Sequence, residues 1–136
     1  FWSAIQLIQA AVPGMRERRW GRILSIGSVQ QVRPNPNLLV YAGLKSALSN
    51  AMRGLSRAHA DFGITANTLA PGLIDTDRNA ELKGDPALYR SILDRIPVGE
   101  AGTAEDCVPA ALLLCSDAGR YITGIDRLGD GGMHVP

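Results

Sequence analysis

The 136-residue sequence contains little cysteine, and its only two, Cys107 and Cys115, stand eight residues apart. This spacing does not match a metal site, and two cysteines cannot form the framework of a disulfide-rich domain. Both are therefore predicted to be small buried hydrophobic residues in a reducing compartment. The two histidines, His59 and His134, have no metal-ligand partner at usable spacing. We expect no metal site.

The sequence also lacks a surplus of charge and a long hydrophobic run. Fourteen basic and thirteen acidic residues give a net charge of +1, which excludes a strong overall field toward nucleic acid or an anionic membrane. Aromatic residues make up only 5% of the chain, and Trp2 and Trp20 are not interleaved with basic residues as on a nucleic-acid platform. The apolar runs are too short to span a bilayer, and no signal peptide is visible. We expect no nucleic-acid or membrane partner, and a cytoplasmic location.

What is present is the composition of one globular domain, with 46% hydrophobic and 20% charged residues. The chain begins Phe1-Trp2-Ser3-Ala4-Ile5, without a methionine and already inside an apolar, helical pattern. Natural domains seldom begin with bare core residues. We therefore expect this sequence to be a piece of a longer protein.

The hydrophobic pattern predicts alternating helices and strands. Helices are expected over residues 1–15, 38–62, 85–95 and from 104 onward, and strands over 22–28, 64–70 and 125–128. Gly63 stands where a left-handed cap would end the longest helix, and Thr103 to Asp106 resembles a capping box. Strands that alternate with long helices predict an α/β fold whose parallel sheet is covered on both faces.

The longest predicted helix carries apolar residues at three-four spacing, which predicts one face packed on the sheet. These positions are Val40, Leu44, Ala47, Leu48, Ala51, Leu55, Ala58 and Phe62.

Tyr41 and Lys45 stand at positions i and i+4 of this helix, so the phenol and the ammonium are neighbours on one face. A nearby ammonium favours the phenolate, which would bring a tyrosine toward the range in which it can transfer protons. The pair alone is a weak signal, because tyrosine and lysine meet at this spacing by chance in many proteins.

Two further features point to the same end of the sheet. Ser28 ends the strand before that helix, and Pro71-Gly72 ends the next strand. In an open parallel sheet, ligands bind in the crevice beyond the carboxyl ends of the strands. Ser28 and Tyr41 can therefore converge on one small carbonyl or hydroxyl group, while the turn at Gly72 lets the backbone approach a flat ligand.

Taken together, these motifs resemble the short-chain dehydrogenase/reductase family. The segments that carry the resemblance, in chain order, are GRILSIGS at 21–28, YAGLK at 41–45, NTLAPGLIDT at 67–76, YITG at 121–124 and DGG at 130–132. The resemblance covers all 136 residues but only about the C-terminal half of a family member. It implies a Rossmann-like, doubly wound parallel sheet, with residues 1–136 as the C-terminal part of a single NAD(P)-binding domain.

The resemblance also implies roles for individual residues and NAD or NADP as the cofactor. Tyr41 would give or take the proton at the substrate oxygen, and Ser28 would hold and polarise that oxygen. Lys45 would stabilise the phenolate and bind the nicotinamide ribose, so that Tyr41 and Lys45 both lie against the cofactor. The residues expected beside the nicotinamide ring and its carboxamide are Pro71, Gly72, Ile74 and Thr76.

Other parts of the family pattern differ or are not found in the sequence. Gly27 stands where a second serine is common, which leaves Ser28 as the catalytic serine. The glycine-rich turn that binds the pyrophosphate, the residue that selects NAD or NADP and the family's catalytic asparagine are all expected before Phe1. Residues 77–95 match the variable substrate lid, with an apolar face formed by Leu82, Leu88, Tyr89, Ile92 and Leu93.

Two functions follow as hypotheses. The first is an NAD(P)-dependent oxidoreductase that interconverts a small carbonyl substrate and a secondary alcohol by hydride transfer, with a 3-oxoacyl reductase as the favoured type. The second is a truncated, catalytically inert folding or assembly module of the same family. The resemblance further implies a homo-oligomer, either a dimer or a tetramer.

Overall fold

The computed structural model describes residues 1–136, apart from the side chain of Arg78. Its helices are α1 (Trp2–Glu17), α2 (Leu39–His59), α3 (Ala80–Lys83), α4 (Pro86–Leu93) and α5 (Ala104–Cys115), and its strands are β1 (Gly21–Ile26), β2 (Ile64–Pro71) and β3 (Asp126–Gly129). Every predicted helix and strand is present, with ends shifted by no more than three residues. The short helix α3 is additional and lies within the predicted lid.

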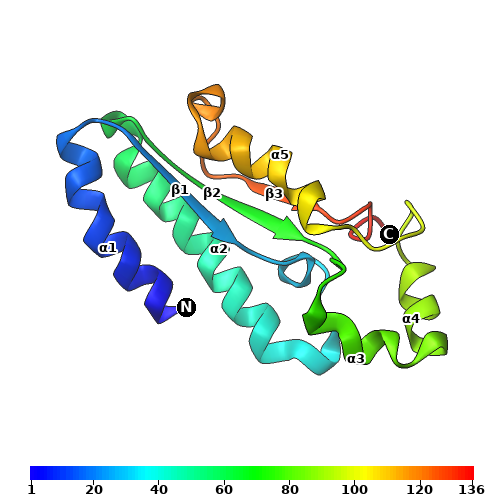
Figure 1. Ribbon diagram of the computed structural model, residues 1–136. Coiled ribbons are helices and arrows are strands. Elements are labelled where there is room, and N and C mark those ends of the chain that lie inside the picture. Colours follow the sequence, from blue (N-terminus) through cyan, green and yellow to red (C-terminus); the bar gives the residue numbers. More distant parts are fainter.

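The described strands form a parallel sheet in the order β1-β2-β3. The central strand β2 is buried from Ile64 to Ala70, as expected for a strand covered on both faces. Figure 1 shows α1 and α2 on one face of the sheet and α5 on the other. This arrangement confirms the predicted α/β fold with a doubly covered parallel sheet.

Helix α2 packs on the sheet through a stripe of mostly small residues, and this corrects the predicted face. The buried positions are Ala42, Ser49, Met52 and Ser56, whereas Val40 is 77% exposed. Apolar residues lie on more than one side of the helix, so their spacing could not identify the side that meets the sheet. Small side chains let the helix backbone approach the strands, and the larger apolar residues near its start face outward.

Helix α2 ends three residues before the expected end at residue 62, while the left-handed cap stands at the expected glycine. A short 3-10 turn follows the helix, and Gly63 then adopts a left-handed conformation with a φ of 70°. A Cβ atom at Gly63 would overlap the carbonyl oxygen of Arg19. A glycine is therefore needed at position 63 for two reasons. It adopts the left-handed cap conformation, and it leaves room for the α1–β1 connection at Arg19.

Helix α5 begins at the predicted capping box, in which the Thr103 hydroxyl accepts from the Asp106 N–H while the Asp106 carboxylate accepts from the Thr103 N–H. The prediction of two buried cysteines is wrong for Cys115, which is exposed at the end of this helix. Cys107 is half-buried, and this burial raises the pKa of its thiol. The apolar residues of α5 surround the helix, so that only some of them can face the sheet.

The buried Asn67 in β2 fixes the connection that leads to β3. Its side chain donates to the carbonyl of Ile122 at 2.8 Å and accepts from the N–H of Ile125 at 3.2 Å. The hydroxyl of Thr123 accepts from the N–H of Ala66 at 3.1 Å. Hydrogen bonds thus join the NTLAP and YITG segments noted in the sequence. They also satisfy the side-chain amide of Asn67, which is fully buried.

The carboxyl ends of the strands open toward α3 and α4 (Figure 1). There Gly72 donates to the carbonyl of Gly129 at 3.0 Å, and a Cβ atom at Gly72 would lie 2.7 Å from the Cβ of Asp130. The segment after β2 therefore packs directly against the turn after β3 and needs a glycine to do so. We call the edge of the sheet formed by the segments that follow β1, β2 and β3 the rim. The candidate site lies at this rim.

Candidate active site

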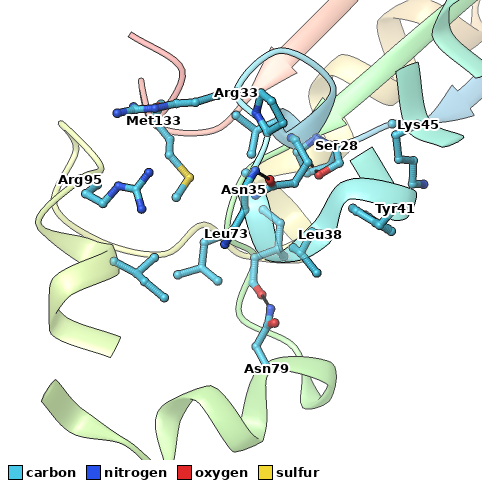
Figure 2. Close-up of a pocket in the computed structure, with 18 of the residues that line it drawn as sticks. Ser28, Arg33, Asn35, Leu38, Tyr41, Lys45, Leu73, Asn79, Arg95 and Met133 are labelled. Carbon is cyan, nitrogen blue, oxygen red and sulfur yellow. Dashed lines mark hydrogen bonds between the residues drawn. The ribbon is translucent and has the colours of Figure 1, made fainter. Parts of the chain in front are cut away.

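A cavity of about 920 Å³ lies at the carboxyl ends of β1 and β2. All seven residues expected at the site line this one cavity, namely Ser28, Tyr41, Lys45, Pro71, Gly72, Ile74 and Thr76. They come from three separate parts of the chain, the end of β1, the first turns of α2 and the segment after β2. Figure 2 shows Ser28, Tyr41 and Lys45 on one side of this cavity.

Lys45 is positioned by the strand as well as by its own helix. Its Nζ donates to the carbonyl oxygen of Ile26, the last residue of β1, at 2.6 Å. The same Nζ lies 5.7 Å from the centroid of the Tyr41 ring. The ammonium thus brings a positive charge to the side of the cavity where the phenol lies, as the i and i+4 spacing predicted.

Ser28 is held by a capping box that surrounds the 3-10 turn Val29–Gln31. The Ser28 Oγ accepts from the N–H of Gln30 at 3.2 Å, and the Ser28 N–H donates to Oε1 of Gln31 at 3.2 Å. Ser28 is only 8% exposed. Because the cap uses Oγ as an acceptor, the hydroxyl proton remains available for donation to a ligand oxygen in the cavity.

Gln31 also accounts for the glycine that precedes Ser28. A Cβ atom at Gly27 would overlap Oε1 of Gln31 and would lie 2.6 Å from Cγ2 of the buried Thr68. The serine common at this position in the family would therefore displace the capping side chain. The other serine of this strand, Ser25, shares a buried 2.8 Å hydrogen bond with Thr68 and is not a lining residue of the cavity.

The segment after β2 forms another wall with both apolar and polar groups. Pro71 and Ile74 bring apolar surface to the cavity, and Thr76 brings a hydroxyl group. A backbone pairing between Ile74 and Gly102 anchors the segment, and the backbone N–H of Asp75 donates to the carbonyl oxygen of Gly102 at 2.7 Å. The apolar surface suits the nicotinamide ring of NAD or NADP. The hydroxyl of Thr76 and the Lys45 ammonium suit the polar groups at that end of the cofactor.

The predicted lid contributes fewer residues than its pattern suggested. Leu82 of α3 and Ile92 of α4 line the cavity, whereas Leu88, Tyr89 and Leu93 are not among its described lining residues. Leu88 is instead an exposed residue of α4. Helices α3 and α4 are both short, and each directs one residue at the cavity.

Sequence reasoning missed several polar lining residues and the part played by Gln31. Ser28 and Gln31 match the serine-x-x-glutamine pattern of a capping box, so that pattern was a usable signal. The missed lining residues with polar side chains are Gln30, Arg33, Asn35, Asn79 and Arg95. They lie in loops, in short 3-10 turns or just after a helix, where no periodic pattern marks a residue as facing a ligand.

Known proteins similar to this chain identify its family. Residues 1–134 match the family model described as enoyl-(acyl carrier protein) reductase. The 3-oxoacyl-[acyl-carrier-protein] reductase of Pseudomonas aeruginosa is 38% identical over 133 residues, which are 98% of this chain and 53% of that protein. The chain belongs to the short-chain dehydrogenase/reductase family. It spans about half the length of the curated family members it matches.

Solved structures of the family superpose closely on the chain. A 3-oxoacyl (acyl-carrier-protein) reductase of Agrobacterium tumefaciens with NADP bound has a TM-score of 0.91 and 39% identity, over 96% of this chain and 52% of that one. A gluconate 5-dehydrogenase of Burkholderia cenocepacia, in complex with NADP and tartrate, has a TM-score of 0.94 and 32% identity, over 98% of this chain and 52% of that one. The fold is thus the Rossmann-type fold of these enzymes.

Two further properties concern the part of the chain that the structure describes. None of its helices is both long and apolar enough to cross a membrane. Among the described side chains, no group of three or more His, Cys, Asp and Glu residues is arranged to hold a metal ion.

Proposed function

We propose that this chain is the C-terminal part of an NAD(P)-dependent oxidoreductase that interconverts a carbonyl group and a secondary alcohol. The observation that carries the proposal is the convergence of Ser28, Tyr41 and Lys45 with the segment Pro71–Thr76 on one cavity. The similarity to a reductase and a gluconate dehydrogenase with NADP bound supports NAD or NADP as the cofactor.

In the proposed reaction the chain's own groups handle the oxygen and the proton. The Ser28 hydroxyl keeps its proton and donates a hydrogen bond to the substrate oxygen, and Tyr41 gives that oxygen its one proton as the carbonyl is reduced. The Lys45 ammonium stabilises the phenolate that remains. The nicotinamide supplies the hydride to the carbonyl carbon when it is bound. Leu82 and Ile92 would exclude water from the reacting groups.

A 3-oxoacyl thioester is the first substrate to assay. The curated 3-oxoacyl-[acyl-carrier-protein] reductases that match the chain support this choice. Consumption of the reduced cofactor with an acetoacetyl thioester would be followed by absorbance in the full-length protein. Reduction at a rate typical of enzymes supports the proposal, whereas the absence of turnover with this and other ketones would argue for the inert module.

Cofactor binding tests whether residues 1–136 act alone. The purified chain would be titrated with NADH and NADPH, with fluorescence as the readout, before and after addition of the upstream half. We expect weak or undetectable binding by the chain and recovery with the upstream half, because the glycine-rich turn is expected there. Micromolar binding by the chain itself would refute the view that residues 1–136 form only an inert module.

Exposed apolar residues support assembly into a homo-oligomer, either a dimer or a tetramer. They lie on three helices, with Leu7 on α1, Val40 on α2 and Leu112 on α5 as examples. Apolar side chains of this kind fit an interface where they form a contiguous patch, and the same observation fits the alternative of an assembly module. Light scattering of the parent and of Leu112→Lys would show whether α5 takes part. The cytoplasm remains the proposed location.

A further inference from the structure

The cavity is strongly positive, although the chain as a whole is nearly neutral. Three cationic side chains, Arg33, Lys45 and Arg95, line it, and its described lining residues include no aspartate or glutamate. Of these three, the proposed mechanism uses only Lys45. Charged groups gathered in a cleft raise the local concentration of ligands of opposite sign. The two arginines therefore indicate that the cavity binds an anionic ligand.

The two arginines lie away from the reacting groups. Figure 2 shows Arg33 and Arg95 at the end of the cavity opposite Tyr41 and Lys45, with Met133 at the same end. Arg33 is anchored there, because its Nη1 donates to the carbonyl oxygens of Met133 and Val135. This anchoring uses one of its three nitrogens and leaves donors on the guanidinium for a ligand.

The carboxylate next to Arg95 in the sequence and the one on the turn that anchors Arg33 are both paired elsewhere. Asp94, next to Arg95, forms an ion pair with Arg90 at 2.9 Å. Asp130, on the C-terminal turn, accepts from ring and backbone nitrogens of His134 at 2.8 and 2.9 Å. Among the described residues, the Arg95 side chain has no hydrogen-bond or ion-pair partner.

The wall between the two ends of the cavity is mainly apolar. Leu73 lies between the reacting groups and the arginines (Figure 2), and Ile92 and Met133 add apolar side chains to the cavity lining. A ligand that spans the cavity would therefore present an oxygen to Ser28 and Tyr41, a short aliphatic stretch in the middle and an anion to the arginines. Guanidinium groups pair with carboxylates in a bidentate manner.

We infer that the substrate of this site is an oxo acid or hydroxy acid whose carboxylate is bound by Arg95 with the help of Arg33. This inference rests on the proposed function for the reaction, but the anion site itself is defined by the cavity. The other anion that could meet the arginines is a phosphate of the cofactor, and the test below separates the two.

The test uses ketones in matched pairs, each an acid and its neutral methyl ester, with the full-length protein and NADPH or NADH. Acetoacetate with methyl acetoacetate and levulinate with methyl levulinate differ at the remote end alone, where the ester lacks the negative charge and carries one added methyl group. We expect kcat/KM to favour the acids, and Arg95→Gln to lower kcat/KM for the acids about tenfold or more, through KM, with little change for the esters. The matched control is Arg57→Gln, an exposed arginine of α2 outside the cavity, which should leave both rates unchanged.

Three results would overturn the inference. The first is equal use of acid and ester by the parent protein, and the second is an equal effect of Arg95→Gln on both. The third is a loss of NADPH affinity in Arg95→Gln as large as the loss for the acids, which would assign the arginine to the cofactor.

Calorimetry separates failure of the anion site from failure of the proposed reaction. If neither ketone of a pair is reduced, binding of levulinate and methyl levulinate is measured without turnover. Preferential binding of levulinate that is lost in Arg95→Gln supports the anion site even though the proposed reaction fails. Binding of neither compound, or equal binding of both, overturns the site as well.

Discussion

Lys45 donates a hydrogen bond from Nζ to the carbonyl oxygen of Ile26 at 2.6 Å, and so joins the first half of α2 to the carboxyl end of β1. The i and i+4 spacing places Lys45 beside Tyr41, but this bond to the strand determines where the ammonium lies. Lys45 therefore has a structural part in the rim in addition to its proposed part in proton transfer.

Lys45→Met should weaken both the fold and the site. The loss of this exposed, charge-assisted hydrogen bond is expected to reduce the free energy of unfolding by about 1 kcal/mol. Urea denaturation followed by circular dichroism measures this loss. Lys83→Met is the control, because Lys83 forms an exposed ion pair with Asp75 and should change stability little. Equal stability of Lys45→Met and the parent would show that the bond to Ile26 does not hold the rim.

Gln31→Leu should impair catalysis through the position of Ser28. Without Oε1 of Gln31, the Ser28 N–H loses its partner and the turn that orients the hydroxyl is loosened. In the proposed enzyme we expect kcat to fall about tenfold while KM changes little. Gln31→Glu keeps an acceptor oxygen and should retain most of the activity. A matching decrease in both variants, or none in either, would contradict this role.

The elements of the fold were predictable because their signals are local. The glycine that caps the turn after α2, the capping box of α5 and the alternation of helices with strands each depend on residues close together in the chain. The shared rim was predictable too, because parallel strands bring their carboxyl ends to one edge of the sheet. Ser28, Tyr41 and the turn at Gly72 could therefore be placed together before their contacts were known.

The anion end of the cavity could not be predicted because it depends on contacts between distant segments. Arg33 is anchored by the carbonyl of Met133, a hundred residues away in sequence. The face of α2 that packs on the sheet was likewise predicted wrongly from the spacing of apolar residues. The side that packs there carries small residues, including Ala42 and Ser49. Such choices follow from how closely two elements can approach, and that distance is a property of the assembled fold.

Gly72→Ala should destabilise the rim by about 1–3 kcal/mol, since its new methyl group would meet Asp130 in a packed contact. Gly54→Ala is the matched control, because a methyl group at that exposed position of α2 meets no atom within 4 Å. It should stabilise the protein by about 0.5–1 kcal/mol, as alanine does in a helix. Thermal unfolding of both variants provides the comparison, and a stable Gly72→Ala would contradict the close packing described above.

The capping box of α5 predicts a stability that depends on pH. Hydrogen bonds from the N–H and the hydroxyl of Thr103 lower the pKa of Asp106 in the folded protein. A carboxyl group with a lowered folded-state pKa stabilises the fold at pH values above its unfolded pKa. This stabilisation is lost as the pH falls through the lower, folded-state pKa.

Asp106→Asn should accordingly melt at a lower temperature than the parent at neutral pH, and the difference should shrink as the solution becomes acidic. Calorimetric scans across this pH range measure the effect. Glu105→Gln, on the same first turn, removes a charge without removing a bond to Thr103 and should show a smaller dependence. A difference between Asp106→Asn and the parent that is constant with pH would contradict the assignment.

The most direct test of the central claim is the effect of Tyr41→Phe on turnover and on cofactor affinity in the full-length protein. The substitution removes the phenolic proton and keeps the ring that lies 5.7 Å from Nζ of Lys45. We predict that turnover with the best ketone substrate is abolished, while the Kd for NADPH or NADH stays within about twofold of the parent value. Normal turnover in Tyr41→Phe would contradict the proposal that Tyr41 transfers the proton at this site.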